Sequence, residues 1–167
     1  MEYTKHIGII ALALSSLLIS CGSTKDITTA EVEHPAELSS VEFTTIVRNE
    51  LSGAGEEGLV QSMIVVRTQE EWEALKEKMN KVNNETDAFE TPEFVDFSSE
   101  MLIACFDRVR STGGYDLHVN HITESTDTMN VFIELAIPAG AATSVLTQPY
   151  SIIKLTKTDK TIVETRW

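Results

Sequence analysis

The chain begins with an apolar segment that ends at a cysteine. Lys5 precedes residues 7–19, which are apolar apart from two serines and a glycine, and Cys21 follows closely. A helix that crosses a membrane needs about 20 apolar residues, so this segment is too short for a span and is typical of an export signal. We therefore predict that residues 1–20 are a signal peptide and that the folded protein is built from the remainder.

Residues 18–21 read Leu-Ile-Ser-Cys, which fits the lipobox of bacterial lipoproteins. In that motif the cysteine thiol is alkylated by diacylglycerol and the chain is cut just before it. We expect Cys21 to carry this covalent lipid, with no other cofactor. The lipid would hold the protein to a membrane of the bacterial cell envelope, with the outer membrane favoured and the domain facing the periplasm or the cell surface. The alternative is an ordinary secretory signal in which Cys21 is incidental.

The remaining 147 of the 167 residues suffice for one domain and a tether. The sequence has two cysteines, so lipidation of Cys21 leaves Cys105 as the single free thiol and no intramolecular disulfide is expected. Cys105 lies in the apolar run 101–106, which predicts a buried, unreactive thiol. The formal charge of −13 argues against binding to nucleic acid or to anionic lipid surfaces.

Residues 21–40 are rich in Ser, Thr and acidic residues and predict a flexible stalk, which leaves 41–167 as the domain. Alternating or β-branched runs predict strands. They are residues 41–51, 59–67, 101–108, 115–122, 128–138, 150–156 and 161–167. The first two are expected to form a hairpin across the glycine-containing residues 52–58, and the short later connections predict antiparallel neighbours.

One helix is predicted over residues 69–80. Thr68 and Glu71 form the sequence pattern of a capping box, and Trp72, Leu75 and Met79 lie on one apolar stripe. The fold class is therefore α+β: a mainly antiparallel β-sheet with one amphipathic helix packed on it.

Few residues suggest chemistry. In a strand, Asp116, His118 and Asn120 share a face, which is an incomplete metal site; the other candidates, His34, His121 and Asp107, have no recognisable ligand spacing. The acidic connection holds several carboxylates without the spacing of a calcium loop. These are Asp87, Glu90, Glu93, Asp96 and Glu100. Motifs of serine hydrolases, zinc proteases and phosphate-binding loops are absent from the sequence, so no catalytic residue is predicted.

Gly113 and Gly114 directly precede a predicted strand that begins with Tyr115. Two glycines allow a positive φ or a close backbone approach, so this turn could form a rigid lip that carries an aromatic side chain. An ordinary hairpin turn is the alternative.

Four motifs in this order resemble the C-terminal domain of the PrcB family, lipoproteins of protease complexes. They are Glu71-Trp72, Val95–Ser98 leading into Met101–Ala104, Thr112–Tyr115, and Gln148–Ile153. The resemblance extends from about Arg67 to Leu155. It implies a non-catalytic, lipid-anchored accessory subunit that binds another envelope protein, such as a protease. It also implies a protein-binding role for Gly113, Gly114, Tyr115, Pro149 and Tyr150.

Three functional hypotheses follow. The first is a non-enzymatic accessory or scaffolding lipoprotein. The second is a protease inhibitor, with residues 113–114 or 139–147 as its inhibitory loop. The third is a lipoprotein that binds a metal ion or a small ligand.

Overall fold

The computed structural model describes residues 38–82, 95–140 and 143–166. Two four-stranded sheets and one helix make up this part of the chain. The elements are β1 (Ser39–Ser40), β2 (Thr44–Leu51), β3 (Ser62–Val66), α1 (Gln69–Met79), β4 (Glu100–Phe106), β5 (Asp116–Glu124), β6 (Thr128–Ala136), β7 (Gln148–Thr156) and β8 (Thr161–Arg166). The predicted α+β class is confirmed, and each predicted strand and the helix appear within a few residues of their expected bounds.

The helix forms as its sequence predicts. Thr68 Oγ1 accepts from the backbone N–H of Glu71 at 3.2 Å, and Glu71 Oε2 accepts from the backbone N–H of Thr68 at 3.2 Å. This reciprocal capping box satisfies donors that the first turn of a helix cannot pair internally. Trp72, Leu75 and Met79 are buried against the neighbouring sheet.

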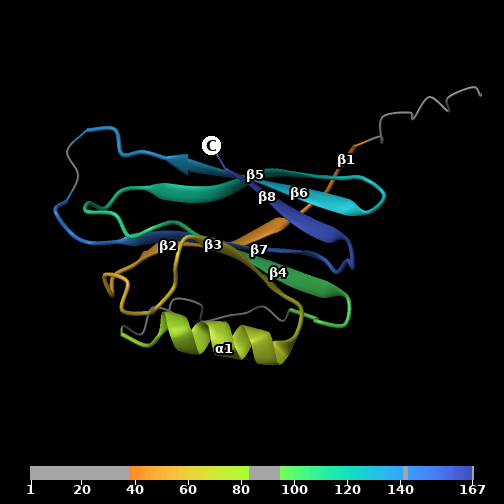
Figure 1. The fold of residues 1–167 in the computed structure, drawn as a ribbon, viewed down its shortest axis with the longest axis horizontal. Coiled ribbons are helices and arrows are strands. Elements are labelled where there is room, and N and C mark those ends of the chain that lie inside the picture. The colour runs from red at the N-terminus through yellow and green to blue at the C-terminus, as the bar shows by residue number, and fades with distance from the viewer. Residues whose placement is uncertain (1–37, 83–94, 141–142, 167) are drawn as a thin grey trace, which may run out of the picture. The chain divides into compact units, whose positions relative to one another are not determined.

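The sheets are ordered β1-β5-β6-β8 and β2-β7-β4-β3 (Figure 1). The second sheet lies between the first sheet and α1, because one face of β4 and β7 packs on the helix and the other on the first sheet. Leu102, Ala104 and Phe106 belong to the helix-side core, whereas Met101, Ile103 and Cys105 belong to the core between the sheets. Burial on both faces explains why these strands are continuously apolar rather than alternating.

Two expectations about strand pairing are wrong. Strands β2 and β3 do not form a hairpin; they lie at opposite edges of one sheet, where β2 pairs with β7 and β3 pairs with β4. Strands β4 and β5 are joined by a short connection but belong to different sheets. Strand β8 pairs with β6 in parallel. Because β4 pairs with β7 at the centre of the β2-β7-β4-β3 sheet, β2 and β3 take its two outer edges and cannot pair with each other.

The domain begins slightly earlier than expected. Ser39 and Ser40, assigned to the stalk, pair with Thr123 and Glu124 of β5. Residues 1–37, which hold the predicted signal peptide and most of the predicted stalk, lie outside the described residues.

Candidate functional site

The Gly113–Tyr115 turn connects β4 to β5 and is held by a carboxylate from β2. The backbone N–H groups of Gly114 and Tyr115 both donate to Glu50 Oε1, at 3.0 Å and 3.1 Å. Gly114 has a φ of +86°, in the left-handed region that favours glycine. The turn is therefore defined by its backbone and by one acceptor on a distant strand.

Gly113 provides a close approach to the connection between β6 and β7. A Cβ atom at this position would lie 3.0 Å from Thr143 Oγ1 and 3.3 Å from Glu50 Oε2. The N–H of Gly113 donates to the Thr143 carbonyl at 3.2 Å. A larger residue would push the two connections apart, so the glycine pair has a structural role in bringing them together.

Tyr115 is half-buried and stacks on an arginine. The Arg110 guanidinium carbon lies 4.8 Å from the centre of the Tyr115 ring, and Arg110 Nε donates to Asp107 Oδ2 at 2.5 Å. Cation–π contact and charge-assisted hydrogen bonding both fix Arg110. The aromatic side chain predicted to border the turn is thus supported from beneath by an ion pair.

Further hydrogen bonds join three connections at the same end of the sheets. Arg110 and Thr147 exchange backbone hydrogen bonds of 2.7 Å and 3.1 Å. The buried Gln148 side chain donates from Nε2 to the carbonyls of Leu59 and Asp107, at 3.0 Å and 2.8 Å. Figure 1 shows the β2–β3, β4–β5 and β6–β7 connections together at this end. A rigid frame of this kind presents loop residues with little ordering cost.

Exposed apolar residues lie on the β6–β7 connection, which approaches the turn. Ile137 is 74% exposed, Leu146 is 48% exposed and Val145 is 44% exposed. Val145 Cγ1 would contact a Cβ at Gly113, and Pro138, next to Ile137, would contact one at Gly114. We define the loop surface as Gly114, Tyr115, Ile137, Val145 and Leu146. Val145 and Leu146 lie within residues 139–147, which were predicted as an alternative inhibitory loop, whereas Ile137 was not predicted.

Pro149 and Tyr150, also predicted for protein binding, are placed differently. Both are buried, and Tyr150 is 0% exposed. The Tyr150 ring stacks on Phe106, with 6.0 Å between ring centres, in the core beneath α1. These two residues therefore do not contribute to the accessible loop surface.

The polar cluster on β5 is engaged in ion pairs. Asp116 pairs with Arg48, whose Nε donates to Asp116 Oδ1 at 2.9 Å. His118 Nδ1 lies 3.7 Å from Asp116, but its other nitrogen, Nε2, lies 3.7 Å from Glu134. Asn120 donates to Glu134 at 3.1 Å. The two carboxylates face opposite nitrogens of the imidazole and cannot share one metal ion with it. Among the described residues, no group of three or more His, Cys, Asp or Glu side chains is arranged to hold a metal ion.

The acidic connection lies partly outside the described residues, which exclude Asp87, Glu90 and Glu93. Asp96 accepts hydrogen bonds from Ser98 and Ser99, and these bonds lower the pKa of its carboxyl group. The hydrogen bond from Lys154 likewise lowers the pKa of Glu100. Both described carboxylates therefore stabilise the start of β4.

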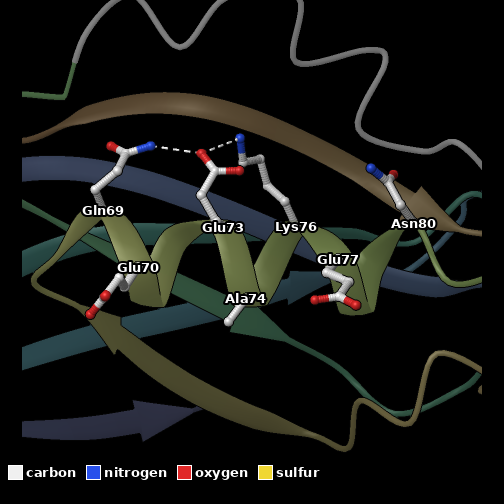
Figure 2. A pocket seen from close by; sticks show the side chains of 7 residues that line it. All are labelled: Gln69, Glu70, Glu73, Ala74, Lys76, Glu77 and Asn80. Atoms are coloured by element: carbon white, nitrogen blue, oxygen red, sulfur yellow. Dashed lines mark hydrogen bonds and ion pairs between the residues drawn. The ribbon is translucent and has the colours of Figure 1, made fainter.

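A hollow of about 680 Å³ borders the outer face of α1 (Figure 2). All its described lining comes from the helix itself, including Gln69, Glu73 and Lys76, which Figure 2 shows joined through the Glu73 carboxylate. Lys76 lowers the pKa of Glu73. The polar side chains on this helix face form hydrogen bonds and ion pairs with one another. They are not arranged around a binding site for a ligand.

Replacing Glu50 by alanine should loosen the turn without unfolding the domain. The change leaves the Gly114 and Tyr115 amides without their common acceptor, at an expected cost of about 1–2 kcal/mol. Hydrogen exchange measures the effect directly, and both amides should exchange faster. Glu50→Gln keeps an acceptor oxygen and should change exchange less; unchanged exchange in Glu50→Ala would contradict the assigned role.

The predicted lipid site, Cys21, lies outside the described residues. No helix in the described segments is both long and apolar enough to cross a membrane.

Comparison with known protein families gives a match over the second half of the chain. The family model described as PrcB C-terminal matches residues 101–156, which run from the start of the doubly buried strand β4 through the turn to the end of β7. No curated protein and no solved structure matches the chain. The earlier motifs, including Glu71-Trp72, precede the matched residues. Over residues 101–156 the chain thus carries the sequence pattern of the PrcB C-terminal family, which confirms the resemblance of its motifs.

Proposed function

We propose that this protein is a lipid-anchored, non-catalytic accessory subunit of the bacterial cell envelope that binds another envelope protein, with a protease as the first candidate. Diacylglycerol on Cys21 would tether it to a membrane, preferably the outer membrane. The match to the PrcB C-terminal family suggests association with a protease complex.

The observation that carries the proposal is the loop surface. Three apolar residues that are 44–74% exposed lie on the β6–β7 connection, which approaches the turn fixed by Glu50 at Gly113 and Gly114. Exposed apolar side chains gathered on a rigid frame are typical of protein contact sites, where aromatic and aliphatic anchors are desolvated by the partner. The family match includes both connections that form this surface.

The arrangement of reactive groups supports a non-catalytic role. Cys105 is 0% exposed, and burial raises the pKa of its thiol to about 12, so it is a poor nucleophile. His118 lies 3.7 Å from two carboxylates, and no serine or cysteine of the described residues pairs with it. The described carboxylates of the acidic connection serve turns and ion pairs.

Placing a charge on the loop surface should abolish partner capture. We expect the tagged, lipid-anchored protein, crosslinked mildly in its native envelope, to retain a stoichiometric protein partner identified by mass spectrometry. Ile137→Glu and Leu146→Glu should each reduce the yield of that partner at least tenfold, because an uncompensated carboxylate would be buried in the contact. Their melting temperatures should be unchanged, since both side chains are exposed.

Val163→Glu is the matched control, because Val163 is 40% exposed on β8, outside the loop surface. This variant should capture the partner as the unaltered chain does. Equal capture by all three variants would place the contact elsewhere, and absence of any stoichiometric partner would contradict an accessory-subunit role.

The same surface favours protease inhibition as a second candidate. The β6–β7 connection is fastened through Thr143 to Gly113 and through Thr147 to Arg110, as an inhibitory loop must be fastened to resist cleavage. Inhibition of a subtilisin- or trypsin-like enzyme that disappears in Leu146→Glu would support this function. If the protein inhibits no enzyme in a panel of this kind, the inhibitor function is excluded and the accessory role is favoured.

A further inference from the structure

A small cleft lies between the two sheets, beneath the loop surface. Its volume is about 70 Å³. Leu117 of β5 and Ile133 of β6 contribute apolar walls from one sheet. The polar lining is contributed by Gln61 before β3, by Asp107 and Arg110 after β4, and by Arg166 at the end of β8. The cleft therefore joins elements of both sheets and differs from the surface proposed for protein binding.

The Arg166 side chain points between the sheets because side chains alternate in direction along β8. Ile162 and Arg166 are four residues apart in the strand and so share a face, and Ile162 packs on the core between the sheets. The Arg166 side chain is only 18% exposed. Burial lowers the pKa of its guanidinium, an effect that the nearby Cys105 and Asp107 partly oppose. A cation in this position needs strong acceptors to offset its desolvation.

The guanidinium of Arg166 has unused donors. Its Nε donates to the Glu164 carboxylate. Its Nη1 and Nη2 atoms are buried, and neither has a hydrogen-bond partner among the residues that the structure describes. Asp107, the carboxylate on the cleft wall, already accepts from Arg110 Nε at 2.5 Å and is itself only 3% exposed. The terminal edge of the Arg166 fork therefore remains available for an added acceptor.

The shape of the cleft limits what that acceptor can be. A volume of about 70 Å³ corresponds to roughly two water molecules, which leaves room for one small planar group and excludes sugars or nucleotides. Two parallel N–H donors match a carboxylate, which accepts from an arginine fork with both oxygens. The nearby carboxylates of Asp107 and Glu164 would repel a dianion more strongly than a monoanion, which disfavours phosphate.

We propose that this cleft binds a carboxylate, held by Arg166 Nη1 and Nη2 between the two sheets. The ligand is either a free small carboxylate or the carboxylate of a peptide, from a chain terminus or an acidic side chain. The site does not depend on the loop surface or on the proposed accessory function.

Acetate and acetamide test the proposal, because the two have nearly the same shape and differ in charge. In the ¹⁵N-labelled full chain, acetate at constant ionic strength should cause saturable chemical-shift changes at the Arg166 side chain and at neighbouring amides, and should raise the melting temperature. Acetamide and chloride should do neither. Equal responses to acetate, acetamide and chloride would overturn the proposal and leave the cleft a water site.

Arg166→Gln should weaken acetate binding at least about tenfold, because it removes the charged fork. Arg48→Gln is the matched control: Arg48 is an exposed arginine on β2 that pairs with Asp116 of β5 and does not line the cleft, so its loss should leave acetate binding unchanged. If Arg166→Gln does not fold, the acetate and acetamide comparison in the unaltered chain still decides the question. Retained acetate binding in a folded Arg166→Gln would overturn the assignment.

Short peptides with free or amidated C-termini distinguish the sources. A free-terminus peptide that binds at least tenfold more tightly than both acetate and its amidated form identifies a chain terminus as the ligand. A peptide that responds only when it carries Asp or Glu identifies an acidic side chain. Peptides no better than acetate identify a free small carboxylate.

Discussion

Replacing Tyr150 by alanine is expected to reduce the free energy of unfolding by about 3–5 kcal/mol. Tyr150 is 0% exposed and its ring packs on Phe106 in the core between α1 and the β2-β7-β4-β3 sheet. The substitution would leave a cavity bounded by residues from both layers, which cannot close without moving the helix. A domain of this size is stable by about 5–15 kcal/mol, so the loss is a large fraction of the total. Urea denaturation followed by fluorescence measures it.

Tyr150→Phe is the matched control, because it keeps the ring and removes only the hydroxyl. We expect a loss of stability well below that of Tyr150→Ala, because the ring packing is kept, and unchanged partner capture. If Tyr150→Phe instead abolished capture while the domain stayed folded, Tyr150 would be a contact residue despite its burial. If Tyr150→Ala left stability unchanged, the packing described around Phe106 would be incorrect. The pair of variants therefore separates a core role from the binding role suggested by the sequence resemblance.

The helix illustrates what sequence could predict well. Its capping box, its apolar stripe and the charges at its ends all act within a few residues of one another. Such local interactions are readable from sequence because no distant partner is needed to form them. The same holds for the individual strands, whose apolar content reflects their burial, and for the β5–β6 hairpin, whose connection is short.

Strand pairing was less predictable because it depends on residues far apart in the chain. The continuous apolar run of β4 indicated burial but did not reveal that each face meets a different layer. Once β4 and β7 pair, their remaining edges are taken by β3 and β2, which separates the strands expected to form a hairpin. A parallel β6–β8 pair has no signature in the short sequence of β8.

The candidate site was predictable only where it depends on residues close together in the chain. Gly113 and Gly114 marked an unusual turn, and the structure gives each a steric or conformational reason. Nothing near Glu50 in sequence indicated that its carboxylate would accept from this turn, 64 residues away. The unused donors of Arg166 likewise depend on which carboxylates lie nearby in three dimensions.

The largest kinetic effect is expected at Cys105. Burial raises the pKa of this thiol to about 12, although Arg166 opposes the shift. At pH 8 the folded chain would hold roughly 10⁻⁴ of the thiol as thiolate, against roughly a quarter for a free cysteine of pKa about 8.5. Reaction with an aromatic disulfide reagent should therefore be about a thousandfold slower than in the unfolded chain, and slower still because the thiol is covered.

The direction of the pKa shift also predicts a loss of stability at alkaline pH. The folded chain keeps the Cys105 proton that the unfolded chain releases above a pH of about 8.5. The contribution of this thiol to the free energy of unfolding is fully present below that pH. It declines as the pH rises towards 12. Cys105→Ala removes the titrating group, so its unfolding free energy should depend less steeply on pH across this interval. An equal slope in both chains would contradict the raised pKa.

The inert Cys105 makes thiol counting a test of the lipid anchor. The precursor has two cysteines, so one thiol should react before unfolding and two afterwards, the first being Cys21 in the predicted stalk. The mature chain from the envelope should show none before unfolding and one afterwards, because diacylglycerol occupies the Cys21 thiol.

Intact-chain mass spectrometry should show the added lipid, and Cys21→Ser should give the same thiol counts as the mature protein but remain out of the membrane fraction. Two thiols in the unfolded mature chain would exclude lipidation, whereas one thiol without the added mass would indicate cleavage of an ordinary signal peptide after Cys21.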